Sequence, residues 1–117
     1  MVIADVSTSY YTRIVEDVDW QHGAEHMWSQ HQVSVEQANE ALDDADAVVI
    51  DPDTKSRSGQ SARIIGYSPS AGAVITVILV RREDKPGAWW GANGWPANTT
   101  DRRTYQKQNE ETESSDD

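Results

Sequence analysis

The run of residues 73–80, AVITVILV, constrains the fold of this chain more than any other stretch. Thr76 is its only polar residue, and most of the run is β-branched, a type of side chain that loses rotamer freedom in helices. The run is also short for a buried helix. It therefore predicts a strand near the middle of a sheet, covered on both faces. Arg81 and Arg82 follow directly, so this strand brings two guanidinium groups to the edge of the sheet.

The N-terminal part of the chain predicts one short strand and two helices. Alternating apolar residues indicate a strand at 14–19, and the helical period indicates a helix at 21–31. Ser34 and Gln37 form a capping-box sequence that begins a second helix. The apolar stripe of that helix consists of Val35, Ala38, Leu42 and Ala45.

The second half predicts an antiparallel meander followed by a last helix. Strands are expected at 47–50, 62–67, 73–81 and 88–92, with a hairpin turn at 68–72, a bend at 93–96 and a helix at 100–108. The fold class is thus α+β: an antiparallel sheet of four to five strands with two N-terminal helices and one C-terminal helix.

The domain organisation predicted is a single domain over residues 1–107, of which 1–13 are an irregular lead-in. Residues 108–117 contain five acids and no apolar residue, a composition typical of a disordered acidic tail. The absence of Cys excludes a disulfide framework and thiol chemistry. Neither a signal peptide nor a transmembrane run is visible, so we expect a cytoplasmic protein.

The net charge of −10 is unevenly distributed along the chain. Residues 1–54 carry one base and twelve acids, whereas residues 55–107 carry nine bases and three acids. This separation indicates an anion-binding face on a molecule whose other faces are acidic. Randomly scattered surface charge is the alternative.

Arginines form the strongest candidate site, and they are Arg63, Arg81, Arg82, Arg102 and Arg103. They lie on three predicted segments, which converge on one anion if the last helix packs over the sheet. Guanidinium groups bind phosphate in a bidentate manner and stabilise charge that develops during phosphoryl transfer. The alternative is a set of solvated arginines paired with acids such as Glu83 and Asp101.

Aromatic residues accompany these cations. Tyr105 shares a helical face with Arg102, where its hydroxyl could donate to a phosphate or act as an acid. Trp89, Trp90 and Trp95 lie within seven residues of one another, and indoles can stack on bases beside a basic groove. Because Trp89 and Trp90 are adjacent on a strand, they should point to opposite faces. Packing in the core is the alternative for these side chains.

The histidines do not indicate a metal site. His22 and His26 are four residues apart on one helical face, but no third ligand accompanies them, so exposed polar side chains are the better interpretation. His31 falls on the apolar face, as a core or capping histidine would. The acidic residues between 43 and 53 lack the order of a calcium-binding loop. We therefore expect neither a metal nor a cofactor.

Five segments occur in a characteristic order along residues 14–106. They are His31-Gln32-Val33-Ser34, Glu40-Ala41-Leu42, Arg63-Ile64-Ile65-Gly66-Tyr67-Ser68, residues 74–80, and Asp101-Arg102-Arg103-Thr104-Tyr105. This order resembles that of the BrnT-type toxins of bacterial type II toxin–antitoxin modules. The resemblance implies a RelE-like fold, a metal-independent endoribonuclease that inhibits translation and growth, and a BrnA-like ribbon-helix-helix antitoxin as partner, with oligomers formed through that antitoxin.

Cleavage of RNA needs cations around the phosphate, an aligned 2′-hydroxyl and a proton for the leaving oxygen. The residues expected to serve the reaction are Arg63, Arg81, Arg82 and Arg102 at the phosphate, with Glu83 or Tyr105 handling protons. We expect Trp90, Trp95 and Arg103 to bind the RNA substrate.

Two other functions compete with this prediction. Family members tend to carry Ser-Ala-Arg-Arg-Ala before the last helix, whereas this chain has Asn93-Gly94-Trp95-Pro96-Ala97. A non-catalytic module of the same fold, which binds protein or RNA, is therefore the main alternative. The third is an acidic interaction protein whose N-terminal half presents carboxylates such as Asp43 and Asp46 to a basic partner.

Overall fold

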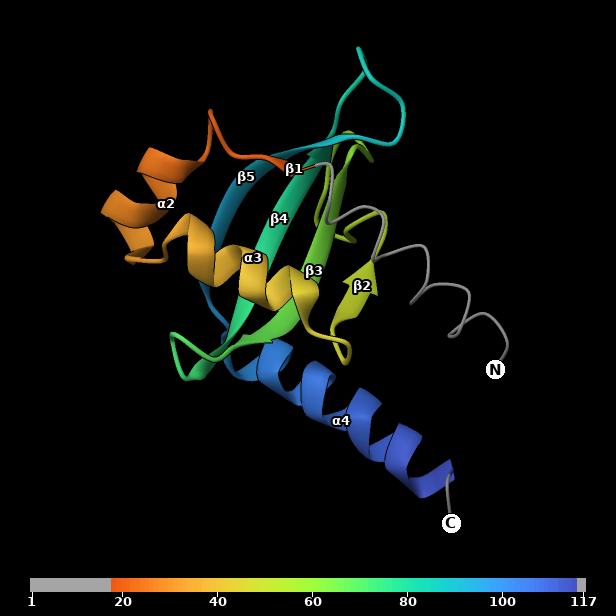
Figure 1. Ribbon diagram of the computed structural model, residues 1–117. Helices are drawn as coiled ribbons and strands as arrows, with labels where there is room; N and C mark the ends of the chain where they lie inside the picture. Colours follow the sequence, from red (N-terminus) through yellow and green to blue (C-terminus); the bar gives the residue numbers. More distant parts are fainter. Residues whose placement is uncertain (1–17, 116–117) are drawn as a thin grey trace.

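A computed structural model describes residues 18–115 of the chain, with side chains described as far as residue 110 (Figure 1). The elements are β1 (Val18–Asp19), α2 (Ala24–His31), α3 (Val35–Asp43), β2 (Val48–Ile50), β3 (Ser61–Ser68), β4 (Ala73–Arg81), β5 (Trp89–Pro96) and α4 (Thr99–Ser115). The predicted lead-in at 1–13 and the first part of the predicted strand at 14–19 lie outside the described residues. The α+β class, with two helices before the meander and one after it, is confirmed.

The sheet has five strands in the order β1-β5-β4-β3-β2, so β4 is its central strand, as the apolar run predicted. Pairing is antiparallel except at one edge, where β1 runs parallel to β5, and the sheet is therefore mixed. Ile75, Val77 and Leu79 on one face of β4 are buried. On the other face Ile78 and Val80 are only half-buried, so the expectation of full cover on both faces holds on one side only.

Helices α2 and α3 cover the first face of the sheet (Figure 1). The capping box that begins α3 is present, because the Ser34 hydroxyl accepts from Gln37 N and the Gln37 side chain accepts from Ser34 N, each at 3.1 Å. Ala38 and Leu42 are fully buried, as the stripe predicted, whereas Ala45 lies beyond the helix in an exposed turn. The core between these helices and the sheet consists of Trp20, Met27, Val33, Ala38, Ala41, Leu42, Ala62, Ile64, Ile75, Val77, Leu79 and Trp89.

Helix α3 is anchored to the β3–β4 hairpin at two points. The backbone of Ala41 passes so close to Gly66 that any side chain at position 66 would collide with the Ala41 carbonyl oxygen. The Glu40 carboxylate accepts hydrogen bonds from the hydroxyls of Ser70, at 2.6 Å, and Ser68, at 2.7 Å. These bonds lower the pKa of Glu40, because they stabilise its charged form.

Strand β5 and helix α4 are both longer than predicted. Asn93, Gly94 and Pro96 are turn-forming residue types, but residues 93–96 continue β5 because they pair with β4, so the predicted bend is wrong. Helix α4 extends to Ser115 rather than ending near residue 108, and it thus includes most of the segment predicted to be a disordered tail. Its Tyr105 hydroxyl donates to the Asp44 carboxylate at 2.6 Å, which fixes the helix against the turn between α3 and β2.

Among the described residues, none of the helices combines the length and the apolar character needed to cross a membrane.

The contact between Gly66 and α3 predicts a position that tolerates no side chain. We expect Gly66→Ala to lower the free energy of unfolding by about 1–3 kcal/mol, because a rigid backbone rather than a flexible side chain must move. Urea denaturation followed by circular dichroism measures this loss. Gly72→Ala is the matched control, since a Cβ there meets open space and only its left-handed φ of +64° opposes the change. A smaller loss at Gly66 than at Gly72 would contradict the packing described.

Candidate functional site

The sheet face opposite α2 and α3, hereafter the open face, carries two tryptophans because β5 contains a bulge. Leu79 pairs with Gly91 and Ile78 pairs with Asn93, which leaves Ala92 as the extra residue. Simple alternation would place residues 90 and 95 on opposite faces. With the bulge, Trp90 and Trp95 lie on the same face, together with Asn93.

The glycines of β5 confirm this assignment of faces. A side chain at Gly91 would collide with the Trp20 ring, and one at Gly94 would lie 2.8 Å from the sulfur of Met27. Both glycines therefore face the helices, and their neighbours Trp90, Asn93 and Trp95 face the other way. These three side chains are half-buried. The predicted opposition of Trp89 and Trp90 is confirmed, since Trp89 belongs to the core.

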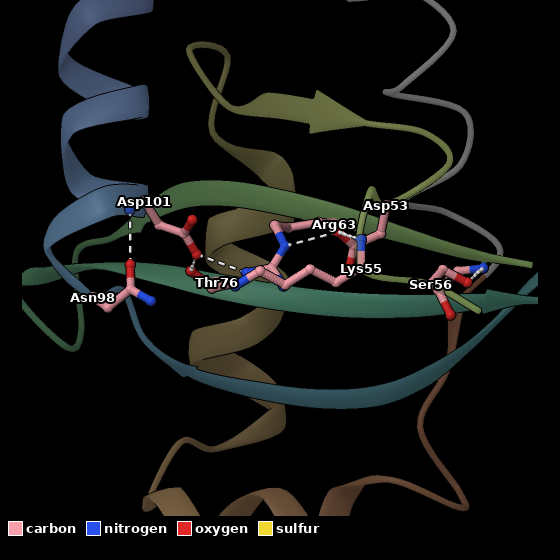
Figure 2. Close-up of polar contacts among 8 residues, drawn as sticks. Asp53, Lys55, Ser56, Arg63, Thr76, Asn98 and Asp101 are labelled. Carbon is pink, nitrogen blue, oxygen red and sulfur yellow. Dashed lines mark hydrogen bonds and ion pairs between the residues drawn. The ribbon is translucent and has the colours of Figure 1, made fainter. Parts of the chain in front are cut away.

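A buried ionic network lies on the open face (Figure 2), and its Arg63 is 5.8 Å from the centre of the Trp95 ring. Arg63 on β3 donates through Nε to Asp53 at 3.2 Å and through Nη1 to Asp101 at 2.8 Å. The same Asp101 oxygen accepts from the Thr76 hydroxyl of β4 at 2.8 Å. Asn98 caps the start of α4 by accepting from Asp101 N at 2.8 Å. The network thus joins two central strands, the first turn of α4 and the loop after β2.

Arg63 remains charged within this network. Burial works to lower the pKa of Arg63, but hydrogen bonding to Asp53 and the charges of both carboxylates outweigh it and raise that pKa. Only 9% of the Arg63 side chain is exposed, and its bonds are directed to protein carboxylates. It is therefore engaged in structure. The alternative considered from the sequence paired the arginines with acids such as Asp101 but placed them in solvent, whereas Arg63 meets Asp101 in a buried network.

Each tryptophan of the open face contacts a cation and a histidine. The guanidinium of Arg82 lies 4.0 Å from the centre of the Trp90 ring, and His22 meets that ring edge-on at 4.7 Å. Trp95 lies 5.8 Å from the Arg63 guanidinium and 5.7 Å from His31. The tryptophans are thus held in place by their neighbours, and His31 is a half-buried rim residue rather than a core residue.

Arg81 and Arg82, although adjacent, are directed to different partners. Arg82 donates to Asp84 at 2.7 Å, and Asp19 lies 3.7 Å away. Arg81 donates to both oxygens of Asp51 at 2.7 Å. Because Arg63 pairs with Ile78, three positions before Arg81 on β4, Arg63 and Arg81 emerge on opposite faces of the sheet.

The remaining predicted residues lie on α4 and in the turn after β4. Arg102 donates to the carbonyl of Ala97 at 2.9 Å, just before the start of its own helix. The pKa of Tyr105 is raised, mainly by burial and secondly by the hydrogen bond to Asp44. Its hydroxyl is therefore a weaker acid than that of a free tyrosine. Glu83 and Arg103 are exposed, in the β4–β5 turn and on α4 respectively.

The structure brings together only part of the predicted site. Arg63 meets the motif that begins at Asp101, and Trp90 and Trp95 share a face with it. Arg81 points elsewhere, and Tyr105 lies against the turn that precedes β2. Each guanidinium of the strands has its own carboxylate, so the expected convergence on one anion is not observed.

Three residues of this network were not selected from the sequence as functional residues. In the sequence Asp53 is one of the acidic residues between 43 and 53, Thr76 is the only polar residue of an apolar run, and Asp101 is only a possible partner of an arginine. A lone polar residue in the middle of a buried strand was the available signal for Thr76, since such a group needs a partner.

Charge is divided between the two sides of the sheet. The layer formed by α2, α3 and the following turn contains no Lys or Arg. Its acidic residues are Glu25, Glu36, Glu40, Asp43, Asp44 and Asp46. The basic flanks of the open face, as we define them, are Lys55 and Arg57 on the loop after β2 and Arg102 and Arg103 at the start of α4. Within residues 18–110 none of these four forms an ion pair.

A metal centre is not evident in the part of the chain that the structure describes, where no three His, Asp or Glu side chains are placed to hold an ion. No protein-family model matches the chain, and no curated protein matches it either.

The ionic network predicts that Arg63 and Arg81 differ in their contribution to stability. We expect Arg63→Met to lower the free energy of unfolding by about 3–5 kcal/mol, because it leaves two buried carboxylates without their cation. Arg81→Met should cost at most about 1 kcal/mol, since the Arg81–Asp51 pair is solvent-exposed. Urea denaturation of both variants measures the difference. Equal losses would contradict the structural role assigned to Arg63.

Proposed function

We propose that this chain is a non-catalytic RNA-binding domain whose binding site is the open face. The carrying observation is the bulge of β5, which aligns Trp90 and Trp95 on one half-buried surface. The two segments that carry the basic flanks, the loop after β2 and the start of α4, are joined to that face through Arg63. Aromatic side chains on a sheet, beside cations that contact the backbone, are the usual means of binding single-stranded nucleic acid. The acidic layer of α2 and α3 lies on the opposite face and would repel RNA there.

The polar contacts of the strand arginines support binding rather than cleavage. A transition state with developing charge needs donors directed at the reacting phosphate. Here the guanidinium groups of Arg63, Arg81 and Arg82 are directed to carboxylates of the protein. Tyr105, the expected proton donor, has a raised pKa and a carboxylate partner.

The ribonuclease toxin expected from the order of motifs is a second proposal. The observation in its favour is that two of those motifs, 38 residues apart in sequence, meet on the open face through Arg63 and Asp101. Under this proposal the chain acts in the cytoplasm, and its partner is a ribbon-helix-helix antitoxin. Induced expression of the chain, with growth and RNA integrity on a gel as readouts, separates the two: arrest accompanied by cleaved RNA favours the toxin, and intact RNA favours the binding domain.

RNA binding is tested by fluorescence anisotropy of a labelled oligouridine with the full chain. We expect Trp95→Ala to weaken binding by about tenfold, because stacking contributes about 1–3 kcal/mol per base. Arg103→Glu should also weaken binding and reduce its dependence on salt concentration, because it removes a cation from a basic flank.

Lys85→Glu is the matched control for the charge reversal. Lys85 is exposed on the β4–β5 turn, at the end of the sheet opposite α4 (Figure 1). The Lys85→Glu substitution should leave the affinity for oligouridine nearly unchanged. A wild-type chain that does not bind oligouridine at low salt, or equal effects at positions 85 and 103, would refute RNA binding by the open face.

A further inference from the structure

We propose that Asn93 is a site of spontaneous deamidation in the folded chain. The backbone nitrogen of Gly94 attacks the side-chain carbon of Asn93, and the product carries a carboxylate on the open face, between Trp90 and Trp95 along β5. The proposed modification is independent of RNA binding. Only its consequence for affinity rests on the function proposed above.

The Gly94 N–H is not part of the ladder between β4 and β5. Ala97 N donates to Val74 O at 2.9 Å, so Val74 and the alternate residues that follow it on β4 direct their backbone groups toward β5. Gly94 pairs with Val77, which lies at the other parity and directs its groups toward β3. The Gly94 N–H therefore points away from β4. On that side β1, as far as the described residues go, pairs with the first two residues of β5 and does not reach Gly94.

The Gly94 N–H is directed at the Asn93 side chain instead. It donates to Asn93 Oδ1 at 2.9 Å, and the partner must be the amide oxygen because an N–H needs an acceptor. Since a C=O bond is about 1.2 Å long, the Gly94 nitrogen lies within about 4 Å of Asn93 Cγ. Loss of the N–H proton leaves a lone pair in the same direction, toward the carboxamide. The nucleophile and its target are thus adjacent before the reaction begins.

Closure of the five-membered ring then needs a rotation about the bond between Cα and the carbonyl carbon of Asn93. The bulge makes this rotation easier, because the preceding residue, Ala92, is the extra residue at which the ladder is interrupted. Gly94 has no side chain to crowd its own nitrogen. Asn93 is half-buried, so water reaches it for the hydrolysis that follows.

The overall reaction replaces ammonia by water, with no oxidation or reduction. Hydroxide removes the Gly94 N–H proton, a bond forms between that nitrogen and Asn93 Cγ, and the Cγ–Nδ2 bond breaks as Nδ2 leaves as ammonia with a proton from water. Water then opens the cyclic imide at one of its two carbonyls. Cleavage of the new bond gives aspartate. Cleavage of the original peptide bond gives isoaspartate, which lengthens the backbone of β5 by one carbon atom.

The other three asparagines of the chain have no such arrangement. Asn39 Oδ1 accepts from the Trp20 indole, and the residue that follows lies inside α3. Asn98 Oδ1 accepts from Asp101 N, three residues away, rather than from the next residue. Asn109 lies inside α4 and its amide nitrogen donates to a carbonyl of the preceding turn. These residues are internal controls for the reactivity of Asn93.

Incubation of the full chain at mildly alkaline pH, followed by peptide mapping with mass spectrometry and enzymatic labelling of isoaspartate, tests the site. We expect Asn93 to deamidate at least about tenfold faster than each other asparagine in the folded chain, because its nucleophile alone is positioned. The rate should rise with hydroxide concentration. Asn93→Gln is the matched control, since its longer side chain cannot close a five-membered ring.

The same incubation in urea separates the contribution of the fold from that of the Asn-Gly sequence. We expect Asn93 to react in the folded chain at a rate within about tenfold of that in the unfolded chain. An Asn93 that stays intact in the folded chain and reacts only in urea would overturn the proposal, as would equal rates at all four asparagines in the folded chain.

The consequence for RNA is measured separately, by anisotropy of labelled oligouridine. The incubated wild-type chain and fresh Asn93→Asp should bind about fivefold more weakly than the fresh wild-type chain, as one added negative charge beside a phosphate allows. Incubated Asn93→Gln should keep its affinity. Unchanged affinity after complete deamidation would overturn this consequence and leave the site itself established. A fresh wild-type chain that does not bind oligouridine would refute the proposed function, while the peptide map still decides the site.

Discussion

The open face depends on one buried cation, Arg63, held between the carboxylates of Asp53 and Asp101. These three side chains come from β3, the loop after β2 and the first turn of α4, so a single guanidinium fixes three segments that are distant in sequence (Figure 2). A buried ion pair contributes little more stability than apolar packing of similar volume would. In this protein the ion pairs act by positioning the chain, because they fix the start of α4 and the loop after β2 against β3. The positions of the basic flanks follow from that geometry.

Much of the fold could be predicted from local pattern. The apolar run of β4 identified the centre of the sheet, and Ser34 with Gln37 identified the start of α3, because both signals act within a few residues. The end of β5 could not be predicted in the same way. Asn93, Gly94 and Pro96 favour turns locally, and only pairing with β4 keeps them extended. The acidic end of α4 was likewise predicted to be disordered from its composition, which carries no information on how far an established helix extends.

The candidate site was harder to predict from the sequence than the fold, because its geometry also depends on contacts between distant segments. The arginines of a sequence show where cations occur but not which acids pair with them. In this structure the arginines of the strands are paired with Asp51, Asp53, Asp84 and Asp101. The bulge at Ala92 changes which tryptophans share a face, and no local signal gave its position. The asymmetry of charge along the chain was the more useful guide. It corresponds in part to a separation in space: the helical layer carries acids and no Lys or Arg, whereas the cations without a carboxylate partner in the described residues lie on the loop after β2 and at the start of α4.

The central claim is that the open face is the RNA-binding surface, and the indole N–H signals of the five tryptophans test it most directly. Trp20 and Trp89 are buried in the core, and Trp28 is exposed on α2, which covers the other face of the sheet. Titration of isotope-labelled protein with oligouridine should shift the signals of Trp90 and Trp95 while the other three move little. Changes confined to Trp28, or no change in any indole signal at saturating oligouridine, would contradict the account.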